Sequence, residues 1–318
     1  MDFKKYPIYQ SLISKFLYKG NEREFCPKQI YHTEWIQDVP RFISIEMEHG
    51  NFFETLCIGS GVGGRKTIDL PRKVLTKLQT AQNEVAKKEG KKQPNKPQKK
   101  IGQIRLEEQE YVFRQLCVKY GITVIPTEIL ENGKIIYGNT QIPLLVQWEE
   151  DPTVYLQMTY DIFPTIMLGA EEKFYLAIID LKTTGDIHNT YGKYCYGDPS
   201  NLDKIQGHMY HYGARHISFD LNPHLVDIIS TKVLTLINRN DIKFIMWVFD
   251  YKKQEPENKF IEVEWNSLVK AELFESIRKT ISTIEINEQL GWPTTPEYKF
   301  CLNCPLKKCP DRTMIEKI

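Results

Sequence analysis

Three segments in the middle of the chain carry patterns typical of β-strands. Residues 142–149 (IPLLVQWE), 154–163 (VYLQMTYDIF) and 174–182 (FYLAIIDLK) are rich in β-branched and aromatic residues, and short polar breaks separate them. We expect them to form three neighbouring strands, paired antiparallel.

A helix is expected after these strands. The stretch DPSNLDKIQGHMYHYGAR ends near Arg215, and Ser200 or Asn201 is placed to cap the N-terminus of the helix. Within it, Gln206 and Tyr210 are four residues apart, so they share one helix face, and both side chains can donate hydrogen bonds.

Two further strands and a long helix follow. Residues 242–250 (IKFIMWVFD) are apolar on both faces, which suits a central strand. Residues 259–265 (KFIEVEW) alternate apolar and acidic positions, as a half-exposed strand does. A helix should then run from about Ser267 to Gln289, and the first 130 residues look mainly helical. We therefore predict a mixed α/β fold with a core sheet flanked by helices.

Composition permits one large core but not a uniformly basic surface. The chain has 318 residues, 41% of them hydrophobic, and a formal net charge of +1, so any contact with a polyanion must come from a local basic surface. The candidate is the segment 87–100 (KKEGKKQPNKPQKK). Its composition favours a solvated, flexible loop. DNA contact is the alternative, through Lys87, Lys88, Lys91, Lys92, Lys96, Lys99 and Lys100.

The location of the protein is expected to be intracellular, in the cytoplasm. No apolar stretch approaches the roughly 20 residues that cross a bilayer, and the start MDFKKYPIYQ lacks the apolar core of a signal peptide. In a reducing compartment the seven cysteines should not form disulfides, so clustered ones suggest a metal or redox centre.

Two carboxylates and one amine stand at the ends of neighbouring predicted strands. Asp161 and Asp180 can lie side by side at the rim of the sheet, where they would repel unless a cation sat between them. Lys182 leaves the strand on the same face as Asp180, because residues i and i+2 point the same way. Hard oxygen ligands suit Mg²⁺ or Mn²⁺, and a nearby amine could orient or deprotonate a metal-bound water. The alternative for Asp180 and Lys182 is an ordinary surface ion pair.

The order of these residues resembles the RecB-like branch of the PD-(D/E)XK nucleases. The matching motifs are Asp161 in TYDIF, Asp180 and Lys182 in IIDLKTT, and then Gln206-x-x-x-Tyr210. The resemblance implies a restriction-endonuclease-like core, and it covers residues 26–309, except that 65–135 match no motif and form a probable insert.

An upstream motif departs from that family. The family often has Gly-x-x-x-His on a helix near the metal, and the segment MEHGNFFETLCIG offers Gly50 and then Glu54. Glutamate is also a ligand for hard metals, so Glu54 is expected to complete the ligand set; a helix-surface carboxylate is the alternative. His49 precedes the glycine and would face away.

The cysteines at the two ends of the chain extend the resemblance. Cys301, Cys304 and Cys309 cluster near the C-terminus, and Cys26 stands alone near the start. This arrangement resembles iron–sulfur RecB-like exonucleases, including CRISPR-associated ones and the AddB type of helicase–nuclease subunit, and it implies a structural [4Fe–4S] cluster. Spacing does not separate this from tetrahedral Zn²⁺, because four cysteines suit either.

The resemblance implies a single RecB-like nuclease domain over 1–318 that acts as a divalent-metal-dependent DNA exonuclease on single-stranded or end-containing DNA. Glu54, Asp161 and Asp180, with the carbonyl of Leu181, would hold Mg²⁺ or Mn²⁺, Lys182 would activate water, and Gln206 and Tyr210 would position the strand or Lys182. DNA is the implied partner, with a helicase or a CRISPR integrase as candidates and no membrane. A catalytically silent DNA-binding or scaffold subunit is the alternative.

Overall fold

The structure is a computed structural model of the whole chain. It describes residues 2–16, 25–38, 45–60, 84–88, 90, 101–169, 172–185, 187–188, 204–250, 257–294, 301, 304, 306 and 309.

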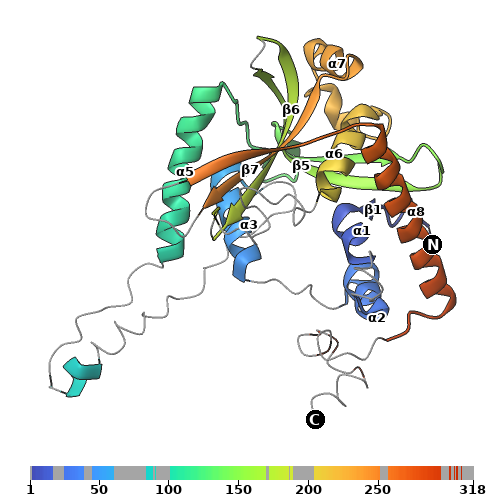
Figure 1. Ribbon diagram of the computed structural model, residues 1–318, viewed down its shortest axis with the longest axis horizontal. Helices are drawn as coiled ribbons and strands as arrows, with labels where there is room; N and C mark the ends of the chain where they lie inside the picture. The colour runs from blue at the N-terminus through green and yellow to red at the C-terminus, as the bar shows by residue number, and fades with distance from the viewer. Residues whose placement is uncertain are drawn as a thin grey trace.

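A six-stranded mixed sheet forms the centre of the molecule (Figure 1). β4 (Thr140–Gln147), β5 (Tyr155–Leu168) and β6 (Phe174–Thr184) are consecutive antiparallel neighbours, as expected from their apolar patterns. β7 (Ile242–Asp250) pairs in parallel with β6 and antiparallel with β8 (Glu257–Val263). Alternate residues of β7 pack into hydrophobic cores on opposite sides of the sheet, which explains why both of its faces are apolar.

The two edges of β5 carry different partners. Ile162 pairs both with Thr140 of β4 and with Ile179 of β6, so β4 and β6 lie on opposite edges. The short β1 (Ile8–Tyr9) pairs in parallel with β5 at Leu156 and Gln157, which β4 also pairs, so β1 shares the β6 edge. Between β1 and β6 that edge of β5 is open over residues 158–161. We call this open stretch the notch.

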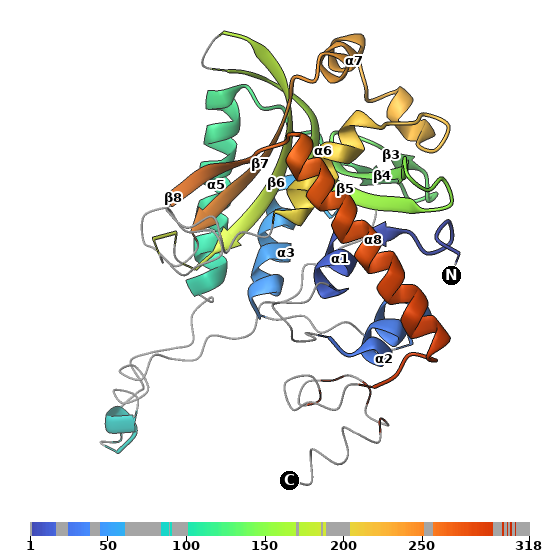
Figure 2. The ribbon, with the colours of Figure 1, turned by 45° about the vertical axis from the view of Figure 1, so that its right-hand side comes forward.

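Helices cover both faces of the sheet (Figure 2). One face packs against α1 (Gln10–Phe16), α6 (Ile205–Arg215) and α8 (Ser267–Gln289), and the other against α3 (Ile45–Ile58) and α5 (Ile101–Tyr120). The remaining elements are α2 (Pro27–Ile30), the π-helical turn η1 (Tyr31–Ile36), the β2–β3 hairpin (Glu128–Ile129 and Ile135–Ile136), η3 (Pro223–Val226) and α7 (Thr231–Asn238). The predicted mixed α/β fold with a helical N-terminal part is confirmed.

The start of α6 differs from its prediction. The helix begins at Ile205 after Lys204, which provides no side-chain cap, while Ser200 and Asn201 lie outside the described residues. By contrast, α8 has the predicted bounds, because the Asn266 side chain accepts hydrogen bonds from the first free amides of the helix.

Part of the predicted insert, residues 65–135, is described. Its helix α5 contributes Phe113 to the core, with the ring 5.1 Å from that of Trp247 on β7.

Within the described part of the chain, no helix combines the length and the apolar character needed to cross a membrane.

Aromatic rings join the segment after Cys26 to the end of α8. Trp292 lies 5.1 Å from Tyr31 and 4.8 Å from Trp35, measured between ring centroids, and Lys28 donates its amide to the carbonyl of Pro293 at 3.2 Å. The early segment therefore packs against a region about 260 residues later.

Two glycines allow α6 to lie close to the sheet. A β-carbon at Gly207 would stand 2.8 Å from Phe244 Cδ1 and 2.9 Å from Val263 Cγ1, and one at Gly213 would stand 2.2 Å from Met158 Sδ. Each distance is too short for a real contact. A side chain at either position would force the helix away from β5, β7 and β8.

Replacing Gly207 with Ala should therefore destabilise the protein. Overpacking typically costs about 1–3 kcal/mol, and the better helix propensity of alanine returns about 1 kcal/mol, so we expect a net loss of up to about 2 kcal/mol in the free energy of unfolding. Urea titration of Gly207→Ala measures it. Val263→Ala removes the obstructing Cγ1 methyl group. In a protein that already carries Val263→Ala, the Gly207→Ala change should therefore lower the free energy of unfolding by less than it does in the wild type. An equal loss in both proteins would contradict this packing.

Candidate active site

A cleft of about 520 Å³ opens at the notch. The sheet and the helices beside it supply one wall, with Glu54, Gln157, Met158, Thr159, Asp161, Asp180, Lys182, Gln206 and Tyr210. The early part of the chain supplies the other wall, with Lys5, Tyr6, Pro7, Tyr9, Gln10, Ser11, Glu34, Trp35 and Gln37. All the side chains predicted to bind Mg²⁺ or Mn²⁺ or to act in catalysis therefore line one cavity.

The register of β5 and β6 brings the two aspartates together. Ile162 of β5 pairs with Ile179 of β6, and Asp161 and Asp180 are the next residues beyond this pair. The two aspartates therefore stand at corresponding positions where β6 leaves β5. Both are almost fully buried, with 5% and 1% of their surface exposed. Two adjacent carboxylates in such a place need compensation by donors or cations.

Asp161 receives hydrogen bonds on both oxygens. The amide of Leu181 donates to Oδ2 at 2.8 Å, and Gln141 Nε2 donates to Oδ1 at 2.9 Å. Gln141 lies opposite Asp161 on β4, and its φ of 52° is in the left-handed region, which costs free energy for a residue other than glycine. The backbone thus holds a strained conformation at the residue that contacts Asp161.

Asp180 is held by an amide and an amine. Gln206 Nε2 donates to Oδ1 at 2.7 Å, and Lys182 Nζ lies 2.5 Å from Oδ2. The lysine side chain is 19% exposed, so its ammonium reaches the cleft rather than open solvent. The predicted alternation on β6 thus places Asp180 and Lys182 on one face, in contact.

Tyr210 ties α6 to the notch. Its hydroxyl donates to the carbonyl of Thr159 at 2.7 Å and accepts from Gln206 Nε2 at 3.3 Å. Burial raises the pKa of Tyr210 strongly, and the negative charges of Asp180 and Asp161 raise it further. The phenol therefore stays protonated and acts as a hydrogen-bond donor to the open edge of β5.

The departure from the family motif lies on α3. Glu54 lines the cleft, and Gly50 lies one turn earlier, where a β-carbon would be 3.6 Å from Thr183 Oγ1 at the end of β6. His49, on the same helix, does not line this cleft. Glu54, not His49, therefore lines the cleft that holds the two aspartates.

The sheet-side wall of the cleft carries three carboxylates, Glu54, Asp161 and Asp180, which is the chemistry that Mg²⁺ and Mn²⁺ prefer. Among the described residues, however, no three histidine, cysteine or acidic side chains are arranged so that they could already hold an ion together. Asp161 and Asp180 instead bond to donors of the protein, and Leu181 contributes its amide rather than its carbonyl.

The four cysteines assigned to a cluster are all buried. Burial raises the pKa of Cys304, the amide of Leu306 lowers it, and the neighbouring thiols Cys26, Cys309 and Cys301 raise it further, which places all four in one region. The amide of Cys304 also donates to the carbonyl of Cys301 at 3.2 Å. Two other cysteines, Cys57 and Cys117, lie in the core beneath α3 and α5.

The lysine-rich segment is described only at its start. Lys87 and Lys88 are exposed on one helical turn over 84–88. Lys91, Lys92, Lys96, Lys99 and Lys100 lie outside the described residues.

Sequence reasoning missed several residues that line or support the cleft. Gln141 follows Asn139 and Thr140 in a polar stretch just ahead of the apolar run that begins at Ile142, so it gave no signal. Glu34 and Tyr9 gave none, since a charged residue on a short helix and an aromatic residue near the chain start are ordinary features.

No protein-family model matches the sequence, and no curated protein matches it. Among solved structures, the fold is similar to a protein of Eubacterium rectale named "Putative exonuclease", with a TM-score of 0.45 and 14% sequence identity over 88% of this chain and 83% of that one. At this distance the likeness does not extend to the chemistry of the cleft.

The strain at Gln141 gives a matched pair of variants. Gln141→Ala and Gln141→Gly both remove the amide that binds Asp161, but only alanine keeps a β-carbon at positive φ. Left-handed backbone costs a residue with a β-carbon about 1–2 kcal/mol, so the glycine variant should be the more stable one by about 1 kcal/mol once its greater chain entropy is subtracted. Urea unfolding of the two proteins compares them. Greater stability of Gln141→Ala would contradict the left-handed conformation.

Proposed function

We propose that this protein is a divalent-metal-dependent DNA exonuclease that hydrolyses phosphodiester bonds at single-stranded or otherwise open ends. The carrying observation is the group formed by Asp161, Asp180 and Lys182 at the point where two strands separate, in a cleft. A purely structural ion pair does not require a second carboxylate beside it, a cavity above it and an amide clamp on each carboxylate.

Asp161, Asp180 and Glu54 would hold Mg²⁺ or Mn²⁺, with the carbonyl of Leu181 as a further ligand. A bound ion of this kind makes water a better nucleophile and neutralises negative charge on the phosphate. The chain must release Asp180 from Lys182 to bind it, because the ammonium now occupies the position beside Oδ2.

Lys182 would orient the attacking water, either as the neutral amine that accepts its proton or as the ammonium that stabilises the hydroxide formed. Its contact with Asp180 shows that the ammonium reaches the carboxylate on the same strand face, so a water bound there would lie within its range. Gln206 and Tyr210 would act indirectly, through Asp180. The Gln206 amide fixes Asp180 Oδ1, and the Tyr210 hydroxyl fixes Gln206 and the backbone of β5. We assign them to the positioning of Asp180.

Cys26, Cys301, Cys304 and Cys309 would hold a [4Fe–4S] cluster, with Zn²⁺ as the alternative. Their common burial supports a shared site, and the packing of Trp292 on Tyr31 and Trp35 independently brings the two ends of the chain together. The cluster would be structural, since these cysteines do not line the cleft.

Lys182→Ala should abolish cleavage and leave the fold intact. A general base or orienting group contributes about 10²–10⁴-fold to the rate, so the cleavage rate of Lys182→Ala should fall by at least 100-fold. The cleavage rate of Asp180→Asn should fall by a similar factor, but excess Mn²⁺ should restore part of it. End-labelled linear and circular single-stranded DNA, incubated with Mg²⁺, Mn²⁺ or EDTA, report activity, metal need and end dependence together.

The matched control is Lys243→Ala, which removes a lysine from the neighbouring strand, where it pairs with Glu262 outside the cleft. It should keep full activity. A loss below tenfold for Lys182→Ala would exclude a catalytic amine, and a wild type that binds DNA without cutting it would point to the scaffold alternative.

Cys26→Ser should lower the metal content as much as Cys304→Ser does, although Cys26 lies far from the others in sequence. Each variant removes one of four ligands, and both should also lower thermal stability. Metal analysis and the visible spectrum of protein purified without oxygen measure this and separate iron from zinc. Cys57→Ser, in the core but outside this group, should keep its metal. Unchanged metal in Cys26→Ser would remove that residue from the site.

A further inference from the structure

We infer that Tyr9 is a stacking platform for a base of the bound strand and that Glu34 is the positioning residue that holds this platform. The inference rests on the proposed function and identifies the part of the cleft that grips DNA beyond the cleaved bond.

Tyr9 lies beside the notch and lines the same cleft as the carboxylate Asp161. It pairs with Gln157 of β5, and Gln157, Thr159 and Asp161 also line the cleft. Four residues along a strand span about 13 Å at roughly 3.3 Å per residue. Tyr9 is thus within about four nucleotides of the carboxylates at the 3.4 Å spacing of stacked bases.

The ring of Tyr9 is half-buried. One part packs against the main hydrophobic core, and another lines the cavity. The core therefore holds one side of the ring in place while the cavity leaves another side accessible, which is the arrangement that base stacking needs. Stacking on a tyrosine does not discriminate between bases, because every base presents a π-face.

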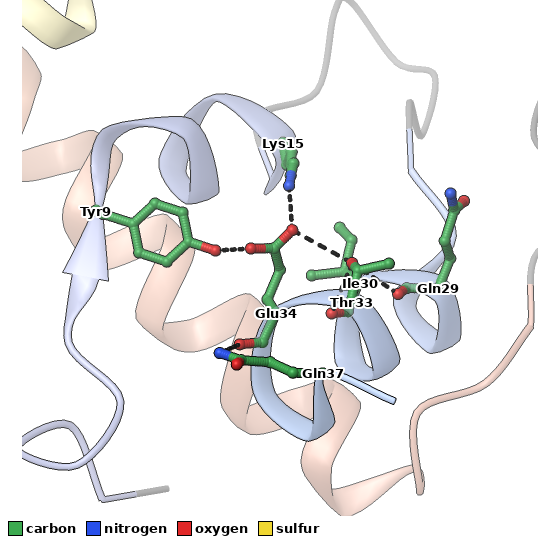
Figure 3. A network of polar contacts seen from close by, with 7 residues as sticks. All are labelled: Tyr9, Lys15, Gln29, Ile30, Thr33, Glu34 and Gln37. Carbon is green, nitrogen blue, oxygen red and sulfur yellow. Dashed lines mark hydrogen bonds and ion pairs between the residues drawn. The ribbon is translucent and has the colours of Figure 1, made fainter. Parts of the chain in front are cut away.

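Glu34 holds the ring by its hydroxyl (Figure 3). The Tyr9 hydroxyl donates to Glu34 Oε2, while Lys15 of α1 and Thr33 bind Oε1, the latter at 3.2 Å. The Glu34 side chain has no exposed surface, and the same residue lines the cleft through its position on η1. One carboxylate therefore joins β1, α1 and η1.

A buried carboxylate is an expensive way to join three elements. Its desolvation must be offset by charge and by hydrogen bonds, here from Lys15, Tyr9 and Thr33. Apolar residues could join these elements at lower cost, but they would not fix the direction of a tyrosine ring. The network specifies an orientation, and the oriented group that faces the cavity is Tyr9.

The surroundings of Tyr9 suit a single strand better than a duplex. Tyr6 and Trp35 also line this wall, and its exposed lysine is Lys5, whose ammonium lies 5.0 Å from the ring centre of Tyr6. The wall thus carries three aromatic residues and one lysine beside the neutralised carboxylate of Glu34, and it lies opposite the wall that carries Glu54, Asp161 and Asp180. Bases within a duplex are stacked on one another and cannot reach such rings, whereas unpaired bases can.

The test measures binding with cleavage stopped by EDTA. Fluorescence anisotropy compares a labelled single-stranded oligonucleotide with oligonucleotides that carry one abasic position, moved through the first six or so nucleotides from the end. Tyr9→Ala should weaken binding of intact DNA about 5- to 150-fold, the effect of removing one base stack. At the abasic position that faces Tyr9, wild type and Tyr9→Ala should bind equally. Tyr111→Ala, an exposed tyrosine on α5, is the matched control.

Glu34→Gln tests the positioning role. It should weaken binding less than Tyr9→Ala does, with KM raised in cleavage assays and kcat nearly unchanged. In a chain that already carries Tyr9→Ala it should cause no further loss, because Glu34 acts through the ring. An additional loss there would show that Glu34 acts otherwise and would overturn its assignment.

The outcomes separate this inference from the proposed function. Cleavage by wild type together with identical affinities of wild type and Tyr9→Ala at every abasic position would overturn the platform alone. A wild type that neither binds nor cuts DNA would overturn both. An equal loss of affinity for intact and all abasic strands would show that Tyr9→Ala damages the wall, and that result also rejects stacking.

Discussion

The cleft depends on one change of partner: β6 pairs with β5 up to Ile179 and then continues along β7 alone. The parallel ladder with β7 runs on through Thr184, so the end of β6 stays rigid after it has left β5. A free loop could not hold Asp180 and Lys182 in this way. The separation also exposes the edge of β5, and the hydroxyl of Tyr210 satisfies the carbonyl of Thr159 there. Backbone pairing therefore positions the charged groups, and α6 completes the arrangement.

The two walls of the cavity have different origins. The acidic wall belongs to the sheet, whose residues are buried and joined by long ladders. The aromatic wall belongs to the early chain, which is anchored by two β1 residues, by the carboxylate of Glu34 and by the packing of Trp35 on Trp292. The second wall thus relies on contacts between distant parts of the chain. Loss of the contact at Trp292 would loosen that wall before it affected the sheet.

Sequence periodicity predicted the sheet, the long C-terminal helix and the side of the strand on which Asp180 and Lys182 meet, because these depend on neighbours a few residues apart. The predicted start of α6 was wrong, since the helix begins at Ile205 and no side chain caps it. Gln141 and Glu34 could not be assigned, because their roles depend on the register of one strand pair and on contacts between elements 19 to 25 residues apart. Pairing partners, unlike periodicity, cannot be read from a single sequence.

The place of β1 has a practical consequence for handling the protein. Residues 5–7 and 9–11 line the cavity, so any polypeptide joined ahead of residue 2 starts only a few residues from the cleft and could compete with what binds there. The β2–β3 hairpin offers a safer attachment point. Its turn at Asn132 and Gly133 is exposed, closed by its own hydrogen bonds and absent from the cavity lining. A purification tag or a fluorophore inserted there would leave both walls untouched.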